Sequence, residues 1–153
     1  MLFTMLDEGL CAIHAPTIIG PEAHDAALLD LEGGTPRLHP GRPLLETLRA
    51  LGFPLEAVVT GGAEPRMQAR EQWQKGTNFF AMAPGKVIGY ARNENTYREM
   101  EALGFRLIAG ADLLADSSAL RAPGRVAVAI EGAELSRGGG GARCMTLPIR
   151  RSP

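Results

Sequence analysis

The sequence has few cysteines and no long apolar run. Only two cysteines, Cys11 and Cys144, occur in 153 residues, too few for the disulfide framework of a small secreted domain. No stretch approaches the ~20 apolar residues that span a membrane. Asp7 and Glu8 stand where a secretion signal requires basic and then apolar residues. We therefore expect a cytoplasmic chain with reduced thiols and no membrane partner, and Cys11, within an apolar stretch, is expected in the core.

An excess of charge of one sign is also lacking. The formal net charge is -1, from 16 Lys and Arg against 17 Asp and Glu, so no basic stripe is expected to neutralise phosphates, and nucleic acid is not an expected partner. No group of residues has metal-ligand spacing, so no metal is expected. With 45% hydrophobic and 22% charged residues, residues 1–153 have the composition of one globular domain or part of one.

Local patterns predict a mixed α/β organisation. Residues 2–5 and 10–13, on either side of a turn, predict a hairpin. Helices are predicted after Pro43 and near Thr96, where Thr96 and Glu99 have the spacing of a capping box. The other elements predicted are strands at residues 26–31, 55–60, 79–83, 87–90, 105–108 and 126–130, a helix at residues 68–74, and either a helix or an inserted arm at residues 112–120.

A short repeat favours one architecture. The tetrapeptide Ala-Leu-Gly-Phe occurs at residues 50–53 and again at residues 102–105. Each copy closes a predicted helix and opens a predicted strand, and paired strands precede both. A repeated ββαβ unit is the simplest account, and chance recurrence of a common helix-glycine-strand junction is the alternative.

The most unusual stretch is the run of four glycines at residues 138–141, followed closely by Arg143 and Cys144. Glycines place no side chain in the way of a ligand, so backbone groups can approach it. Arg143 and Arg137 add positive charge that favours the thiolate, the nucleophilic form of cysteine. The pattern fits a loop that delivers a catalytic cysteine onto a strand at residues 144–149, and it fits equally a flexible loop followed by a small core cysteine.

A resemblance decides between these two interpretations. Residues 134–148 resemble the closing motif of arginine deiminases, in which a glycine-rich loop delivers the catalytic cysteine. Shorter resemblances at residues 3–5, 70–73, 76–78, 83–85 and 90–93 extend the likeness over nearly the whole chain. The matching positions of the closing motif are Leu135, Arg137, Gly138, Gly140, Gly141, Cys144, Met145 and Pro148.

The resemblance implies both a fold and a reaction. The implied fold is the α/β pentein propeller of ββαβ modules, of which this chain would hold about two of the five repeats. The implied reaction is metal-free and cofactor-free and acts on a small guanidine substrate, arginine or an analogue. Cys144 attacks the guanidinium carbon, ammonia leaves, and water hydrolyses the amidino-cysteine to a ureido product. The implied substrate-binding residues are Gly138, through its backbone carbonyl, Arg137 and Arg143.

Parts of the family's site are missing from this sequence. Its histidine and one carboxylate lie in a short motif just before the stretch that residues 3–5 match. His14, His24 and His39 lie elsewhere, in apparent loops or turns, and are expected to be ordinary surface side chains. The reaction needs carboxylates to hold the guanidinium and a histidine to protonate the leaving amine and activate water. We therefore expect this chain to be the C-terminal portion of a deiminase and to be inactive alone.

Several questions of function stay open. Gly139 stands where typical arginine deiminases have an arginine that helps to bind the substrate's carboxylate, so a guanidine without that group is an alternative substrate. Amidinotransfer, in which an amine resolves the same intermediate, is an alternative reaction. A noncatalytic module is the alternative from another class: exposed propeller edges would make the chain a homo-oligomer or pair it with a complementing upstream chain. The role of residues 112–125 is undetermined.

Overall fold

The computed structural model describes residues 1–150, so the last three residues of the predicted 1–153 domain lie outside the described part. The strands are β1 (Phe3–Asp7), β2 (Leu10–Ile13), β3 (Asp25–Asp30), β4 (Arg37–Pro43), β5 (Glu56–Val59), β6 (Phe80–Ala83), β7 (Lys86–Tyr90), β8 (Phe105–Ala109) and β9 (Arg125–Ile130). The α-helices are α1 (Ala15–Ile18), α2 (Leu44–Ala50), α3 (Pro65–Trp73), α4 (Glu94–Ala102), α5 (Gly110–Ala115) and α6 (Ser118–Arg121), with short 3-10 turns η1 (Glu32–Gly34) and η2 (Leu135–Gly138). None of the described helices is long and apolar enough to cross a membrane.

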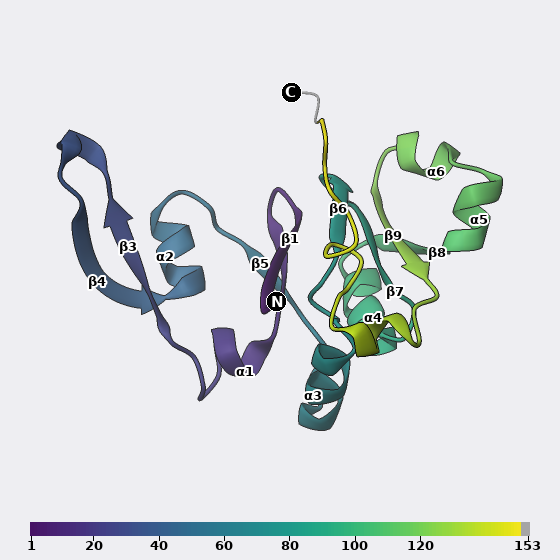
Figure 1. Ribbon diagram of the computed structural model, residues 1–153, viewed down its shortest axis with the longest axis horizontal. Helices are drawn as coiled ribbons and strands as arrows, with labels where there is room; N and C mark the ends of the chain where they lie inside the picture. The colour runs from purple at the N-terminus through teal and green to yellow at the C-terminus, as the bar shows by residue number, and fades with distance from the viewer. Residues whose placement is uncertain (151–153) are drawn as a thin grey trace.

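The strands form three sheets (Figure 1). In the first, with order β1-β2-β5, β1 is antiparallel to β2 and β2 is parallel to β5. In the second, with order β6-β7-β9-β8, β6 is antiparallel to β7, while β7 and β8 both run parallel to β9. The third is the β3-β4 hairpin, which projects away from the other two sheets together with α2. The described residues are therefore a mixed α/β structure without a closed propeller.

The larger of two apolar clusters in the described residues joins the first two sheets, and Cys11, Ile13, Ile18 and Leu55 form the smaller one. Helix α4 contributes buried Tyr97 and Met100, which are three residues apart and so lie on one face of the helix. The ring of Phe79 meets Tyr97 edge to face, with 5.9 Å between ring centroids. Gly89 on β7 makes room for this pair, because a Cβ built there would lie 2.5 Å from a ring carbon of Phe79. The buried members of the core are Leu6, Leu10, Ala12, Val58, Phe79, Val87, Tyr97, Met100, Phe105 and Ala127.

Polar contacts also fix the first sheet against the second. The carboxylate of Asp7, at the end of β1, accepts a hydrogen bond of 2.7 Å from Nε of Arg125, at the start of β9. The same guanidinium donates to the carbonyl of Leu103 at 2.8 Å. Burial raises the pKa of Asp7, but the hydrogen bonds from Arg125 and from the backbone N–H of Glu8, together with the charge of Arg125, outweigh burial, and the net pKa is lowered. The two sheets therefore have a defined relative orientation.

Helix α4 is not capped as the sequence predicts. The capping box proposed for Thr96 and Glu99 is wrong, because α4 begins at Glu94 and Thr96 lies inside its first turn. Its N-terminal N–H groups are instead bound by the carboxylate of Glu71, which comes from α3 and is 1% exposed. Glu71 accepts hydrogen bonds of 2.9 Å from the backbone N–H groups of Asn95 and Thr96. A buried carboxylate at a helix N-terminus is stabilised by both the N–H groups and the helix dipole.

The repeat is reproduced in its junctions but not in its strand pairing. Gly52 and Gly104 have left-handed φ values of 89° and 85°, so the chain leaves α2 and α4 with the same backbone conformation. However, β5 pairs directly with β2, whereas β8 is separated from β7 by β9. Each unit has two paired strands, a helix and a further strand, but α1 and the β3-β4 hairpin lie between β2 and α2 in the first unit, and the additional parallel strand β9 enters the sheet of the second.

Two further predictions need correction. Residues 37–43 form strand β4, which was not predicted, and His39 therefore lies in a strand rather than in a loop. Residues 144–149 form no strand: Cys144 lies in a turn, and an irregular segment follows it. The open prediction for residues 112–120 resolves into the short helices α5 and α6. Buried Lys86 holds α6 through hydrogen bonds from Nζ to the carbonyls of Ala119 and Ala122, of 3.3 and 2.8 Å.

Candidate active site

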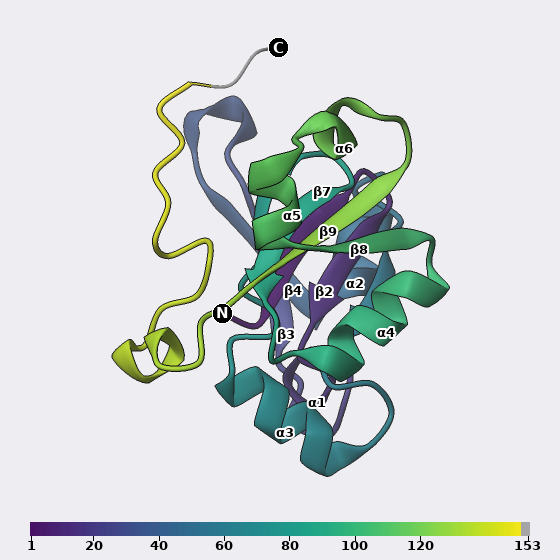
Figure 2. The ribbon, with the colours of Figure 1, turned by 90° about the vertical axis from the view of Figure 1, so that its right-hand side faces the viewer.

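The segment that carries Cys144 follows β9 and runs over the second sheet. Figure 2 shows this C-terminal segment, in yellow, on the side of the sheets away from α4. The hydroxyl of Ser136 in η2 donates a hydrogen bond of 3.2 Å to the side-chain oxygen of Gln74. Further along, the hydroxyl of Tyr90 donates to the carbonyl of Gly140 at 3.3 Å. The glycine-rich loop is therefore anchored to the body of the molecule at two points.

Tyr90 also explains why the segment begins with a glycine. A Cβ built on Gly132 would lie 2.4 Å from the ring of Tyr90, so only glycine allows the chain to cross this ring without displacement. Burial raises the pKa of Tyr90, and the neighbouring Cys144 sulfur adds to the rise. Tyr90 therefore remains a neutral hydrogen-bond donor to the loop at neutral pH.

Asn78 makes the closest polar contacts with Cys144. Its Nδ2 lies 3.0 Å from the sulfur Sγ of Cys144 and donates to it. Its Oδ1 accepts from the backbone N–H groups of Arg143 and Cys144, at 3.0 and 3.4 Å. Gly141 packs against the same amide, because a Cβ built there would lie 2.5 Å from Asn78 side-chain atoms. The buried Asn78 amide thus contacts the sulfur of Cys144, the backbone N–H of Cys144 and the backbone N–H of Arg143.

The two cysteines have opposite chemical character. Hydrogen bonds from the backbone of Gly141 and from the side chain of Asn78 lower the pKa of the exposed Cys144 thiol, and the nearby positive charge of Arg143 adds a smaller effect. Burial raises the pKa of Cys11 to about 11, and its side chain is fully inaccessible. Cys144 is therefore the exposed thiol with the lowered pKa, and Cys11 is a core residue.

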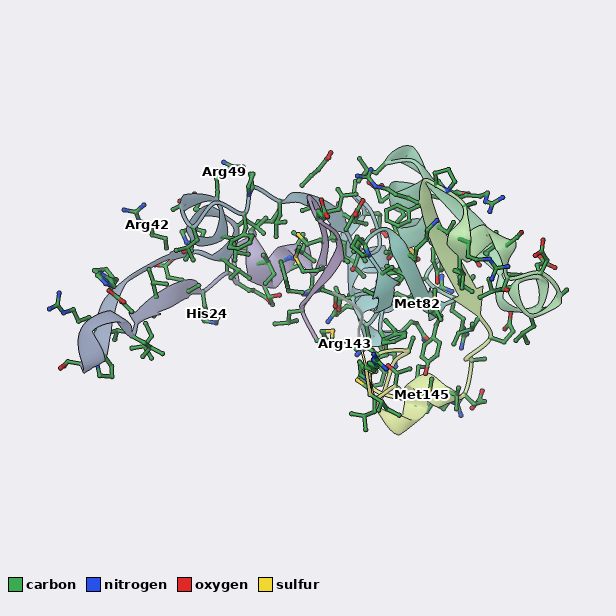
Figure 3. The ribbon with its side chains drawn as sticks, turned by 90° about the horizontal axis from the view of Figure 1, so that it is seen from above. His24, Arg42, Arg49, Met82, Arg143 and Met145 are labelled. Atoms are coloured by element: carbon green, nitrogen blue, oxygen red, sulfur yellow. The ribbon has the colours of Figure 1, made fainter. Side chains whose placement is uncertain are left out.

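Cys144 opens onto a cavity of about 680 Å³ between the C-terminal loop, β1 and β6. Figure 3 shows Arg143 on the side of the loop that faces the N-terminal strands. The walls are mainly apolar, and Arg143 is the only formally charged side chain among them. The lining residues are Met1, Phe3, Thr4, Met5, Phe79, Phe80, Ala81, Arg143, Cys144, Thr146 and Pro148.

The structure brings two of the four predicted site residues together. Arg143 and Cys144 both line the cavity, whereas Arg137 and Gly138 do not. Arg137 instead pairs with Glu134 at 3.2 Å, and both side chains are largely exposed. Gly138 is the last residue of η2 and has no neighbour that would contact an added Cβ.

The described walls of the cavity hold no side chain that could act as a general acid or base beside Cys144. Among the described residues, no histidine and no carboxylate lines it. His14 precedes α1, where burial lowers its pKa, while His24 and His39 belong to the projecting hairpin region (Figure 3). Within residues 1–150, no group of three or more potential metal ligands occurs. In the part of the chain that the structure describes, the Cys144 thiol therefore opens onto a cavity whose walls hold no histidine or carboxylate.

Sequence reasoning singled out Gly141 within the glycine run but did not identify Asn78 or Tyr90 as parts of the site. Asn78 lies 66 residues before Cys144 in the chain, and no local pattern connects positions so far apart. The available signal was indirect: residues 76–78 and 90–93 belong to stretches that resemble the same family as the cysteine loop. That clustering indicates related positions without assigning a role to either side chain.

Comparison with known proteins gives a consistent result. The arginine deiminase family model matches residues 3–151. An arginine deiminase of Mycobacterium marinum is 35% identical over 105 residues, covering 69% of this chain and 21% of the relative. Arginine deiminases of Bacillus cytotoxicus and Clostridium perfringens are 34% and 32% identical, and each alignment covers 98% of this chain but 33% and 32% of the relative. The chain thus spans about a third of the length of the latter two relatives.

Proposed function

The chain belongs to the arginine deiminase family, and on this basis we propose that it supplies the cysteine-bearing part of a site that hydrolyses a guanidine to a ureido product and ammonia. The observation that carries the proposal is the placement of Cys144, whose exposed sulfur opens onto a substrate-sized cavity and receives a hydrogen bond from Asn78. A lowered thiol pKa supports the same role, because the thiolate is the nucleophile.

The proposed reaction has two steps. The Cys144 thiolate attacks the guanidinium carbon, a C–S bond forms, and the C–N bond to a terminal nitrogen breaks as ammonia departs with a proton from a general acid. Water then adds to the amidino carbon, the C–S bond breaks, and the ureido product leaves with the thiolate restored. Both steps need a proton carrier, and neither needs a metal or cofactor.

The remaining groups must come from outside the described cavity. A guanidinium is a cation, and Arg143 repels it unless carboxylates offset that charge. The lining of the cavity in residues 1–150 offers neither carboxylates nor a histidine. We therefore propose that other residues of the parent protein, or a complementing chain, supply them, and that residues 1–153 alone do not turn over substrate.

The fold proposal follows from the same family membership. We propose that the first two sheets are pentein-type ββαβ modules, which would be about two of five in a complete α/β propeller. The shared left-handed conformations of Gly52 and Gly104 support an internal repeat. The extra strand β9 is the feature that this proposal must accommodate.

The substrate class is a small guanidine, either arginine or an analogue. Gly139 has a left-handed φ of 90° and no neighbour within reach of an added Cβ. It therefore presents no side chain with which to bind a substrate carboxylate, and its backbone conformation disfavours an arginine at this position. These features support a guanidine without an α-carboxylate as the alternative to arginine.

A chimera tests the proposal. Residues 1–153 would replace the last third of the Bacillus cytotoxicus arginine deiminase, and release of ammonia and ureido product from arginine would be compared with that of the intact relative. We expect activity that Cys144→Ala abolishes, and none from residues 1–153 alone. A chimera that unfolds cooperatively but is no more active than its Cys144→Ala variant would contradict the proposal. Adding an acceptor amine tests amidinotransfer, the alternative reaction, in the same assay.

A second candidate function is assembly, and the projecting hairpin supports it. Several large apolar side chains in and around the β3-β4 hairpin and α2 are exposed, an arrangement typical of association surfaces. We propose that they contact a second copy or a complementing chain. A monodisperse monomer by light scattering at high concentration would count against this role. The exposed side chains are Ile19, Leu29, Leu31, Leu38, Leu51 and Phe53.

A further inference from the structure

We propose that Asn78 is the positioning residue of Cys144: one end of its amide holds the backbone of the cysteine turn, and the other end directs an N–H group at Sγ. The inference rests on the proposed role of Cys144 as the nucleophile, and it adds a residue to that site. It is carried by three contacts of one side chain, and none of these contacts involves the groups that the site lacks.

The orientation of the amide follows from its partners. Backbone N–H groups can only donate, and those of Arg143 and Cys144 both point at one end of the Asn78 amide, at 3.0 and 3.4 Å. That end must therefore be the carbonyl oxygen Oδ1. The NH2 group is then the end that faces Sγ, at 3.0 Å. A flipped amide would oppose donors to donors and would remove the side-chain donor from the sulfur.

A donor at this position favours the reactive state of the cysteine. A thiolate accepts hydrogen bonds strongly and a thiol accepts them weakly, so an N–H aimed at Sγ stabilises the thiolate selectively. The contact also restricts where the sulfur lies, because Sγ is held against Asn78 while its open side faces the cavity. Asn78 therefore affects both the protonation of Cys144 and its orientation.

Asn78 is itself held rigidly. It is 4% exposed, and its backbone N–H donates to the carbonyl of Lys75 at 2.8 Å in a tight turn. The preceding Gly76 donates to the carbonyl of Glu71 at 2.7 Å, which ties this turn to α3. Since α3 and β6 fix the turn, the amide is in place before a substrate arrives, and a preorganised donor loses no freedom during the reaction.

The discriminating variant is Asn78→Asp, which keeps the size and the oxygen that binds the two backbone N–H groups. It replaces the donor to Sγ with a negatively charged oxygen, so a thiolate is repelled while the turn keeps its support. The readout is the pH dependence of Cys144 alkylation by iodoacetamide, with peptide mass analysis to separate Cys144 from Cys11. We expect the midpoint to rise by at least about one pH unit, or about tenfold less thiolate well below the midpoint.

A matched control separates this effect from loss of stability. Asn95→Asp makes the same chemical change at an amide that donates to Glu71 at 2.8 Å and not to sulfur. It is expected to lower the unfolding midpoint and to leave the pH midpoint of Cys144 unchanged. A merely structural role for Asn78 predicts the same pattern for Asn78→Asp, so an unchanged pH midpoint in that variant overturns the inference.

If Asn78→Asp does not fold, a second variant tests the same inference. Asn78→Ala removes the donor without adding charge, and we expect a smaller rise in the same midpoint; no rise overturns the inference. Iodoacetamide is neutral and needs no guanidine site. Its pH profile therefore tests Asn78 independently of hydrolysis, whereas an inactive chimera would count against the proposed function and leave the Asn78 result in place.

Discussion

Replacing Glu71 by glutamine is expected to destabilise the chain strongly. Oε1 of Glu71 accepts from the backbone N–H and the Nδ2 of Asn95. Oε2 accepts from the backbone N–H and the hydroxyl of Thr96. Glutamine has one oxygen instead of two, so one backbone N–H at the start of α4 loses its acceptor. The Asn95 amide can flip and the Thr96 hydroxyl can rotate, but the backbone N–H groups cannot adapt.

The magnitude follows from two contributions. A buried N–H without an acceptor costs about 1–3 kcal/mol, and removing a negative charge from a helix N-terminus costs about 0.3–1 kcal/mol. Their sum predicts a loss of about 1.3–4 kcal/mol, a large share of the ~5–15 kcal/mol that stabilises a typical domain. The assay is urea unfolding followed by circular dichroism at pH 7.

The control is Glu101→Gln, the same change at an exposed position of α4, for which a change within about 0.5 kcal/mol is expected. A loss below about 1 kcal/mol for Glu71→Gln would refute the reasoning, because it would mean that the N–H groups of α4 do not depend on this carboxylate.

Three further outcomes are expected. Asp7→Asn should cost about 1–2 kcal/mol at pH 7. Because the folded-state pKa of Asp7 is lowered, this stabilisation is present above the unfolded pKa of about 4 and is lost as pH falls through the folded pKa. The difference in urea unfolding between Asp7→Asn and wild type should therefore shrink at low pH. Gly89→Ala should cost about 1–3 kcal/mol in thermal unfolding, since its Cβ would overlap the ring of Phe79. Tyr90→Phe should change stability by less than about 1.5 kcal/mol but increase proteolytic cleavage in the glycine-rich loop, which loses an anchor.

Local signals predicted most of the elements, and strand β4 shows where they fail. The β1-β2 hairpin, α2 and α4 have turn residues, apolar stripes and glycine stops within their own sequences. Strand β4, by contrast, includes Pro40 and Gly41, and nearly all its residues are exposed, so it has no alternating pattern. It is a strand because it pairs with β3, and the amino-acid composition of a segment does not predict such pairing.

The sequence likewise predicted some residues of the candidate site and not others. The glycine run and the resemblance pointed to Cys144, and the structure places that residue in a cavity wall. Residues 144–149 were predicted to form a strand, but the side chains of Met145, Leu147 and Ile149 are 50, 83 and 94% exposed. Within residues 1–150 no strand pairs with this segment, and a strand needs a neighbour that the segment's own sequence does not supply. Asn78 was not identified as a partner of Cys144, because a contact across 66 residues depends on the whole fold.

The most direct test of the central claim, that Cys144 is an activated nucleophile in a guanidine-modifying site, is its labelling by a haloacetamidine, a guanidinium-like alkylating reagent. Intact-mass time courses would compare the folded chain, the urea-unfolded chain and Cys144→Ala at neutral pH. We expect a single addition that is faster in the folded chain than in the unfolded one and absent in Cys144→Ala. We also expect preference for the amidinium over the neutral haloacetamide only in the chimera with the upstream carboxylates. Labelling of Cys144 no faster in the folded chain than in the unfolded chain would contradict the claim.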